Sequence, residues 1–565
     1  MLVAIAIKIE VVAVSRLWRR LLAVATIVTV AMLSFAMLPG TAHAADTGAI
    51  TVDGTVATRY DAYQLFSATV ADDDNADQEV ATDVTWANDA VRQAVLPVLH
   101  DAGLDSTAST AQAAAEWMNA DGHMTTVLTA RLARAIRNAG AVSVALNAGT
   151  AAELPCGYWL IVADDDAIAQ GEAGTAPIMA LVGGSAVTVK PKAATPKVSK
   201  HVLEDSTAAW QKAADATVAD DLYWRLSATV PAGLTAYDTY TVQFVDTMSA
   251  GLDPSKVAAS MHVYVAAGAD GDFDAVSTSK DGRVGTDPAK GWTDITAQCR
   301  VSVDGKSFTV RTGDLIAALG GADAFTAGAR VVAVYNAPLN SACNHGIAKG
   351  NPNEVYLRYP RSPLADQSGD AGFTRTPSDD ACAYTWDLAL TKRGSDGDKP
   401  LAGAVLSITD DRGRTLSADG TWDAEGKATV TTGEDGRVTV SGVDSGKLEV
   451  RELKAPKGYT AFEGTRSVTV KAEGLDVDQV AAAKPKLTIT AESPLRADSA
   501  DGSTGSLEAS LINTPTGTPP SITTGGFMPS TGDMAMYAAA AAAVAGAALI
   551  VVALLVKRGG GSHKE

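Results

Sequence analysis

Aromatic residues, cysteines and positive charges are scarce in this chain of 565 residues. Aromatic side chains make up 5% of the sequence, which disfavours a platform on which nucleic-acid bases stack. The formal net charge of −19 also repels polyphosphate, so we expect no nucleic-acid partner. The sequence contains neither HExxH nor GxSxG, so these motifs support neither metal-hydrolase nor serine-hydrolase chemistry.

The four cysteines, Cys156, Cys299, Cys343 and Cys382, form no CxxC pair, so we expect no metal site and no cofactor. In an oxidising compartment they allow disulfides in several connectivities, and the sequence alone does not choose among them. Cys299 and Cys343 are the candidate pair because they fall in the same expected domain. Free buried thiols are the alternative.

Residues 1–44 have the features of an export signal. Three arginines precede an apolar stretch at 21–38, and residues 42–44 read Ala-His-Ala, the small-x-small pattern of a cleavage site. We therefore predict a secreted protein with a signal peptide at 1–44. A retained N-terminal membrane anchor is the alternative.

A second apolar segment, at 534–556, is followed by Lys557 and Arg558. As a helix its 23 residues would rise about 34 Å, enough to span a bilayer, and the two basic residues mark 557–565 as a cytoplasmic tail. The preceding stretch, 516–533, is rich in Pro, Gly and Thr and is predicted to be an extended, accessible linker. On these features alone, a permanent membrane anchor is one interpretation.

The linker contains Met528-Pro529-Ser530-Thr531-Gly532, one residue before the apolar segment. Pentapeptide, apolar segment and basic tail together resemble the cell-wall sorting signal of Gram-positive bacteria, with Met528 in place of the usual leucine. The resemblance implies that a sortase cysteine attacks the Thr531 carbonyl, releases Gly532 onward and passes the acyl group to an amine. It also implies a wall-anchored surface protein with sortase and peptidoglycan as partners, held by the membrane helix only until cleavage.

Composition divides the remaining chain into three expected domains, 45–190, 191–375 and 380–515. A stretch rich in proline and lysine separates the first two, and a stretch rich in Gly, Ser, Asp and Pro separates the last two. The expected fold class is mainly β, with tandem immunoglobulin-like sandwiches and an N-terminal domain that carries added helices.

Local patterns support this fold class. Helical spacing predicts helices in the first domain at 89–99 and within 111–138. Short β-runs bounded by turn residues predict strands in the other two domains, at 261–265, 308–311, 330–335, 404–408, 437–440 and 447–451.

The last domain contains LTK at 390–392, VRELKAPKGYTAF at 450–462 and SLINTPTG at 510–517. Together these stretches resemble the collagen-adhesin B-type domain of surface pilins. The resemblance implies that Lys392 condenses with Asn513 to an amide while Glu452 shuttles the proton. An apolar core would favour the uncharged forms of the amine and the acid that this reaction needs. The alternative is that Lys392 and Glu452 are surface charges and Asn513 is a turn residue.

The middle domain resembles a fimbrial isopeptide-forming domain through PKVSKHV at 196–202 and VQFVDTMSAGL at 242–252. The resemblance implies that Lys200 is the amine and Asp246 the acid. The asparagine expected after the last-strand tyrosine is replaced by Pro-Arg-Ser at 360–362. Either the domain lacks its cross-link, which is the interpretation that we favour, or Asn353 reacts from a shifted position. We therefore expect loss of one ammonia from the chain, with two as the alternative.

The stretch AVTVKPK at 186–192 resembles the pilin motif of shaft subunits, with Lys190 where the motif has tyrosine. The resemblance implies that Lys192 is the amine that attacks the Thr531 acyl-enzyme of the next subunit. Lys190 and Lys197 are alternatives, and so is a solvated lysine cluster that does not react.

Taken together, these resemblances identify the chain as a sortase-assembled major pilin that joins other copies of itself and ancillary pilins in a surface pilus. Such a protein is not an enzyme, beyond a single-turnover, self-catalysed formation of isopeptide bonds. One alternative is a wall-anchored adhesin or ancillary pilin that binds a host protein or glycan and is never polymerised. A surface glycosidase would need a pair of carboxylates in a cleft, and no spacing singles one out.

Overall fold

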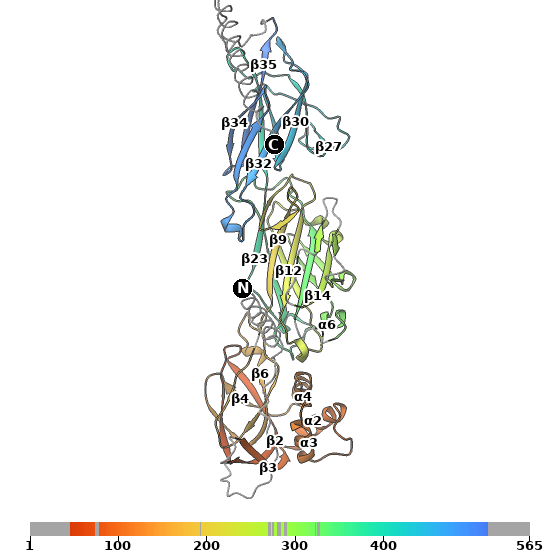
Figure 1. Ribbon diagram of the computed structural model, residues 1–565, viewed down its shortest axis with the longest axis vertical. Helices are drawn as coiled ribbons and strands as arrows, with labels where there is room; N and C mark the ends of the chain where they lie inside the picture. The colour runs from red at the N-terminus through yellow and green to blue at the C-terminus, as the bar shows by residue number, and fades with distance from the viewer. Residues whose placement is uncertain are drawn as a thin grey trace, which may run out of the picture.

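Three β-rich regions follow one another along the long axis of the computed structural model (Figure 1). The structure describes residues 46–517, except for 74–77, 193, 269–272, 274–275, 279–283, 287–290, 322–323 and 325–327. The predicted signal peptide at 1–44, the sorting motif and the apolar segment at 534–556 lie outside the described residues. In the described part of the chain, every helix is too short or too polar to cross a bilayer.

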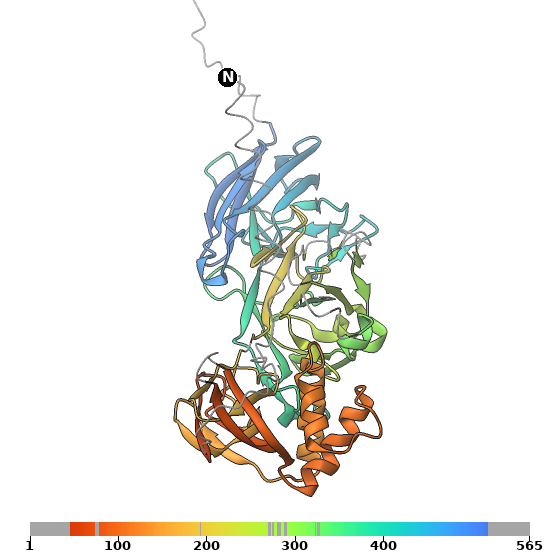
Figure 2. The ribbon, with the colours of Figure 1, turned by 60° about the horizontal axis from the view of Figure 1, so that its bottom comes forward.

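The N-terminal region (47–189) packs two sheets against each other and three helices on one side, as Figures 1 and 2 show. One sheet consists of β3 (Gln78–Trp86), β2 (Arg59–Asp73), β6 (Gly157–Ala163) and β7 (Ile178–Val182), with β4 (Val144–Asn147) beside β2. The other consists of β5 (Ala152–Pro155), β1 (Thr47–Val52) and β8 (Val187–Val189).

The helices of this region confirm the predicted pattern and divide its longer segment into two. They are α2 (Asp89–Asp101), α3 (Ala111–Asn119) and α4 (Thr126–Asn138). Each begins after a residue whose side-chain oxygen accepts a hydrogen bond from a first-turn amide, namely Asn88, Thr110 and Thr125. Between α3 and α4 the chain turns at Gly122, whose φ of +83° suits a residue without Cβ.

The middle region (197–384) is a sandwich of two large sheets around one apolar core. One sheet has the order β10 (Ala209–Gln211), β9 (Lys197–Glu204), β12 (Tyr223–Val230), β20 (Ala329–Asn336), β14 (His262–Ala267) and β17 (Thr293–Asp294). The other has the order β11 (Ala213–Asp215), β23 (Asp379–Tyr384), β21 (Asn351–Pro360), β13 (Gln243–Met248), β19 (Ser307–Arg311) and β18 (Arg300–Asp304), with β22 (Phe373–Arg375) beside β21.

The middle region also contains smaller elements. These are a two-stranded sheet, formed by β15 (Val276–Thr278) and β16 (Val284–Thr286), and two short helices, α5 (Val257–Ser260) and α6 (Leu315–Ala318). The strands predicted at 261–265, 308–311 and 330–335 are confirmed as β14, β19 and β20. Strand β23 pairs with β21 and β11, so this region extends beyond the boundary predicted at 375.

The C-terminal region (386–515) is a second sandwich with its own core. One sheet has the order β29 (Arg437–Val443), β24 (Trp386–Gly394), β35 (Ser506–Pro515) and β31 (Tyr459–Thr460), with β34 (Leu495–Asp501) beside β35. The other has the order β27 (Trp422–Asp423), β26 (Thr415–Leu416), β25 (Val405–Thr409), β30 (Gly446–Lys454), β32 (Thr465–Glu473) and β33 (Lys486–Ala491), with β28 (Val430–Thr431) beside β25. The strands predicted at 404–408, 437–440 and 447–451 are confirmed as β25, β29 and β30.

Hydrogen bonds and ion pairs connect each region to the next. Arg134 on α4 donates to Asp238 at 2.8 Å and to the carbonyl oxygens of Ala236 and Pro363, across the junction between the N-terminal and middle regions. At the other junction, Arg414 donates to both carboxylate oxygens of Asp220, at 2.5 and 2.8 Å. Paired bonds of this kind fix orientation as well as distance, which favours a stiff joint.

Candidate functional site

Two fully buried lysines, one in each sandwich, are the unusual feature of this fold. A lysine inside an apolar core requires partners, because burial of an unpaired charge is very unfavourable. Lys200 in the middle region and Lys392 in the C-terminal region have no exposed surface at all. Each lies in a cluster with a carboxylate and a carboxamide.

The C-terminal cluster joins the first and last strands of its sandwich. Strands β24 and β35 pair in parallel, with Gly394 opposite Asn513 and Lys392 opposite Leu511. Lys392 and Asn513 both point into the core, where Asn513 is 2% exposed. Glu452 comes from β30 in the facing sheet and is 6% exposed. The predicted trio therefore meets between the two sheets.

The contacts within this cluster place all three groups around one carboxamide. Lys392 Nζ donates to Asn513 Oδ1 and lies 3.4 Å from Glu452 Oε1. Asn513 Nδ2 donates to both Glu452 oxygens, at 2.9 and 3.1 Å. The backbone amide of Phe462 donates to Glu452 Oε2 at 3.0 Å and helps to hold the carboxylate in place. The amine thus lies beside the carbonyl, and the acid beside the nitrogen that would leave.

Burial prepares the amine for attack. Desolvation lowers the pKa of Lys392 to about 8, although the negative charge of Glu452 opposes this shift. With that pKa, about a tenth of the amine is neutral at pH 7, far more than for an exposed lysine. A neutral amine next to a carboxamide can act as a nucleophile.

The middle cluster brings together Lys200 on β9, Asp246 on β13 and Asn353 on β21, all 0% exposed. Lys200 Nζ forms an ion pair with Asp246 Oδ2. A fourth group, the hydroxyl of Tyr335 on β20, lies among them. It accepts hydrogen bonds from Lys200 Nζ and Asn353 Nδ2, each at 2.8 Å, and donates to Asp246 Oδ2 at 3.0 Å.

The same electrostatic forces act in this cluster. Desolvation lowers the pKa of Lys200 to about 8, with Asp246 opposing the shift. Desolvation also raises the pKa of Asp246, because a buried carboxylate loses its hydration. Both shifts favour a neutral amine next to a neutral acid.

Asn353, named above as the alternative acceptor at a shifted position, lies in the buried cluster with Lys200 and Asp246. The inward face of β21 consists of alternate residues, so 353 points into the same core as 359. Residues after Tyr359 serve the junction with the N-terminal region instead, where Arg361 donates to the Asp165 carbonyl at 3.1 Å and Ser362 donates to the Asp165 carboxylate. The sequence did not single out Tyr335, the only tyrosine in the uniformly buried strand β20.

The lysines of the pilin-like motif lie at the end of the N-terminal region. Lys192 is exposed and follows β8 by three residues. Lys190 is exposed as well, with its Nζ 4.0 Å from Asp53 Oδ2, and Lys197 is exposed at the start of β9. The sorting-motif residues 528–532 lie outside the described residues.

Cys299 and Cys343 form no disulfide with each other, so the predicted pairing is not found. The two thiols face different neighbours. Cys299 Sγ donates to the Ile295 carbonyl at 3.3 Å, whereas Cys343 Sγ lies 3.5 Å from His345 Nε2. Within the described part of the chain, no group of three His, Cys, Asp or Glu side chains could hold a metal ion.

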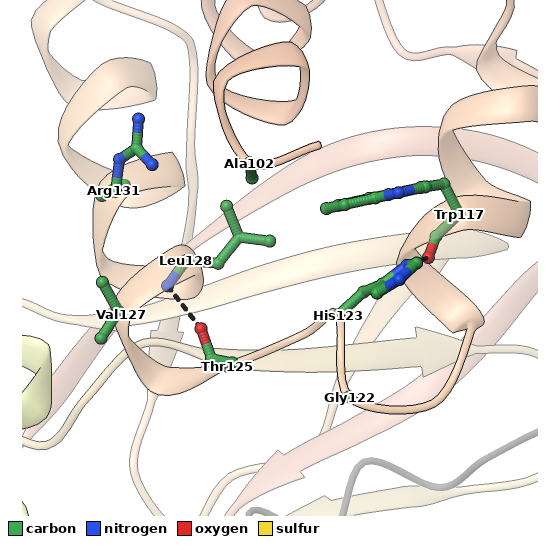
Figure 3. A pocket seen from close by; sticks show the side chains of 8 residues that line it. All are labelled: Ala102, Trp117, Gly122, His123, Thr125, Val127, Leu128 and Arg131. Carbon is green, nitrogen blue, oxygen red and sulfur yellow. Dashed lines mark hydrogen bonds between the residues drawn. The ribbon is translucent and has the colours of Figure 1, made fainter. Parts of the chain in front are cut away.

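A separate cavity of about 230 Å³ lies among the helices of the N-terminal region (Figure 3). Its lining consists of Ala102, Trp117, Gly122, His123, Thr125, Val127, Leu128 and Arg131. The rings of Trp117 and His123 stack with centroids 4.3 Å apart, and the Trp117 carbonyl lies 2.7 Å from His123 Nδ1. None of these residues belongs to either lysine cluster.

Comparison with known protein families finds a match in the C-terminal region. Residues 387–484 match the family model described as "SpaA: Prealbumin-like fold domain", a segment that includes Lys392 and Glu452. Over 143 residues the chain is 30% identical to the trypsin-resistant surface T6 protein of Streptococcus pyogenes serotype M6. That alignment covers 24% of this chain and 24% of the relative, so the chain matches about a quarter of the relative's length.

Solved structures with similar architecture include three pilins. The T6 backbone pilin of Streptococcus pyogenes has a TM-score of 0.46 at 16% identity, covering 84% of this chain and 100% of the pilin. The major pilin SpaD from Corynebacterium diphtheriae has a TM-score of 0.40 at 15% identity, covering 83% and 98%. The major pilin RrgB from Streptococcus pneumoniae has a TM-score of 0.35 at 13% identity, covering 66% and 85%.

Proposed function

We propose that this chain is the structural shaft subunit of a covalently polymerised, cell-wall-anchored pilus. The observation that carries the proposal is the buried trio of Lys392, Asn513 and Glu452, whose lysine and asparagine belong to the first and last strands of one sandwich. The matching prealbumin-like family and the surface T6 protein support it. In this proposal, sortase joins Thr531 of one subunit to Lys192 of the next.

The trio of the C-terminal region forms an isopeptide bond in a single turnover. Neutral Lys392 attacks the side-chain carbon of Asn513, and Glu452 transfers a proton to the departing nitrogen. The carbon–nitrogen bond of the carboxamide breaks, ammonia leaves, and an amide joins the two side chains. The product carries no charge at the former amine, which removes the unfavourable burial of an ammonium group.

We extend the same reaction to Lys200 and Asn353 in the middle region, with Asp246 as the acid. Their complete burial and the contacts around Tyr335 support this extension. The revised expectation is therefore two cross-links and loss of two ammonia molecules. The middle region would then be reinforced by a covalent bond, as the C-terminal region is.

The positions of these bonds suit a protein under tension. Each amide would link a residue near the start of its sandwich to one near the end, so force would pass directly from 200 to 353 and from 392 to 513. The intervening strands would then carry little load. A covalent cross-link between the two strands would resist stretching more strongly than strand pairing alone, because the hydrogen bonds between paired strands can break one after another.

Polymerisation requires an accessible amine, and the surroundings of Lys192 meet that requirement. The residue is exposed and lies three residues after β8, at an edge that an external enzyme can approach. Lys190 differs because its amine lies close to Asp53. Wall anchoring follows from the same chemistry when peptidoglycan supplies the final amine.

The test is the pattern of covalent polymers in cell-wall extracts of the producing bacterium. We expect a ladder of high-mass species that disappears in Lys192→Arg and persists in the matched variants Lys190→Arg and Lys197→Arg. Protease digestion of the ladder should release a branched peptide that joins Thr531 to Lys192. A wild-type extract without a ladder would contradict the shaft role and favour a non-polymerised adhesin or ancillary pilin.

A further inference from the structure

The two lysine clusters differ in how the acid reaches the carboxamide. In the C-terminal region, both oxygens of Glu452 accept hydrogen bonds from Asn513 Nδ2. In the middle region the acid is Asp246, which is one methylene shorter. Its Oδ2 contacts Lys200 and Tyr335, and its Oδ1 has no hydrogen-bond partner among the described residues.

The Tyr335 hydroxyl lies between Asp246 and the carboxamide. It donates to Asp246 Oδ2 at 3.0 Å and accepts from Asn353 Nδ2 at 2.8 Å. It also accepts from the amine, Lys200 Nζ, at 2.8 Å. Aspartate and tyrosine together thus span the distance that a single glutamate spans in the other cluster.

We propose that Tyr335 is a catalytic residue of the Lys200–Asn353 cross-link, and that its hydroxyl relays a proton from Asp246 to the departing nitrogen of Asn353. This inference rests on the proposed cross-link in the middle region. Tyr335 touches both reacting groups directly, so it meets the geometric requirement for a proton-transfer group.

The proton balance of the relay is complete without any added reagent. Proton transfer within the Lys200–Asp246 pair first yields a neutral amine and a neutral carboxylic acid. The amine attacks the side-chain carbon of Asn353, and the tyrosine hydroxyl passes its proton to Nδ2 while it receives one from Asp246. The carbon–nitrogen bond breaks and ammonia leaves. The new amide nitrogen returns its surplus proton to Asp246, so the tyrosine ends unchanged and Asp246, a carboxylate in the starting ion pair, ends as the neutral acid.

The surroundings of Tyr335 suit a relay that is neutral at rest. Burial and the nearby Asp246 raise the pKa of the phenol well above its usual value, so the hydroxyl keeps its proton. The ring is fully buried and packs edge-on against Phe308, with centroids 4.8 Å apart. This packing fixes the hydroxyl and does not depend on the oxygen atom, so removal of the oxygen separates chemistry from packing.

The experiment compares the full-length chain with its Tyr335→Phe variant. Tryptic peptides are followed over time after synthesis by mass spectrometry, and the branched peptides of the two regions are quantified separately. We expect Tyr335→Phe to slow formation of the Lys200–Asn353 peptide by at least about 100-fold, the usual contribution of a positioned proton donor. The Lys392–Asn513 peptide should form as in the wild type and serves as a control for folding and secretion.

A second variant tests the relay itself. Adding Asp246→Glu to Tyr335→Phe supplies an acid long enough to reach Asn353 directly, as Glu452 reaches Asn513. We expect this double variant to recover a substantial part of the lost rate. Unchanged cross-linking in Tyr335→Phe would overturn the inference, and so would a folded double variant that recovers no activity. A wild-type chain without the Lys200–Asn353 peptide would instead overturn the proposed cross-link of the middle region.

Discussion

Glu452→Gln is the sharpest perturbation of the C-terminal cluster. Glutamine has nearly the same shape and retains an oxygen that can accept from Asn513 and Phe462, as Glu452 Oε2 does, but it cannot supply the proton that the departing nitrogen needs. We therefore expect the variant to fold with an intact core and without the Lys392–Asn513 bond. The chain should keep one ammonia, about 17 Da, that the wild type loses from this region.

The stability of the C-terminal region should fall by an amount set by the loop that the bond closes. Lys392 and Asn513 are 121 residues apart in the sequence. In the chain-entropy treatment of cross-links, a loop of that length restricts the unfolded state by about 5 kcal/mol. For a region of this size, such a change corresponds to a fall in melting temperature of about 15–20 °C.

The assay combines intact mass with scanning calorimetry on the same preparations. Glu449→Gln is the matched control, because Glu449 lies on the same strand with a side chain that is 47% exposed and pairs with Lys447. This control should lose its ammonia and melt close to the wild type. Complete ammonia loss in Glu452→Gln would refute the role of the acid. Loss of the bond without a lower melting temperature would refute the stabilisation attributed to loop closure.

Three other expectations follow from the clusters and the cysteines. The intact mass of the wild-type chain should be about 34 Da below the mass calculated from its sequence, because two ammonia molecules are lost. A digest should contain one branched peptide from each sandwich. A digest whose single branched peptide comes from the C-terminal region would contradict the middle cross-link. In the uncross-linked Glu452→Gln chain, desolvation depresses the pKa of Lys392, and the charge of Glu452 that opposes this shift is gone. The unfolded state therefore binds more protons throughout the range from pH 8 to 10.5, so chemical denaturation should show stability that rises with pH across that range. A flat profile would count against a buried amine. Burial raises the pKa of Cys343 and Cys382 to about 11, so these thiols should resist alkylation at pH 8 while the chain is folded. After unfolding, mass spectrometry should find all four cysteines of the chain modified. A disulfide would leave two of them unmodified.

Sequence patterns predicted the strands and helices well because their periodicity reflects local burial. Short β-runs bounded by turn residues marked β14, β19, β20, β25, β29 and β30, and the helical segment at 111–138 was correct apart from the turn at Gly122. The domain boundary was less accurate, since β23 pairs with strands of the middle region through contacts that no local pattern records.

For the candidate sites too, the sequence predicted some features and not others. The amino-acid sequence by itself determined the residue types and order of the C-terminal trio, because Lys392, Glu452 and Asn513 each lie in a recognisable local stretch. It did not determine that Asn353 would lie in the same cluster as Lys200, nor that the Tyr335 hydroxyl would lie between Asp246 and the carboxamide. Those positions depend on how two sheets pack, since alternation along a strand shows which residues point inward but not which of them meet. Only the tertiary structure determines which inward-pointing residues are in contact, because these residues lie far apart in the sequence and come together when the whole core packs.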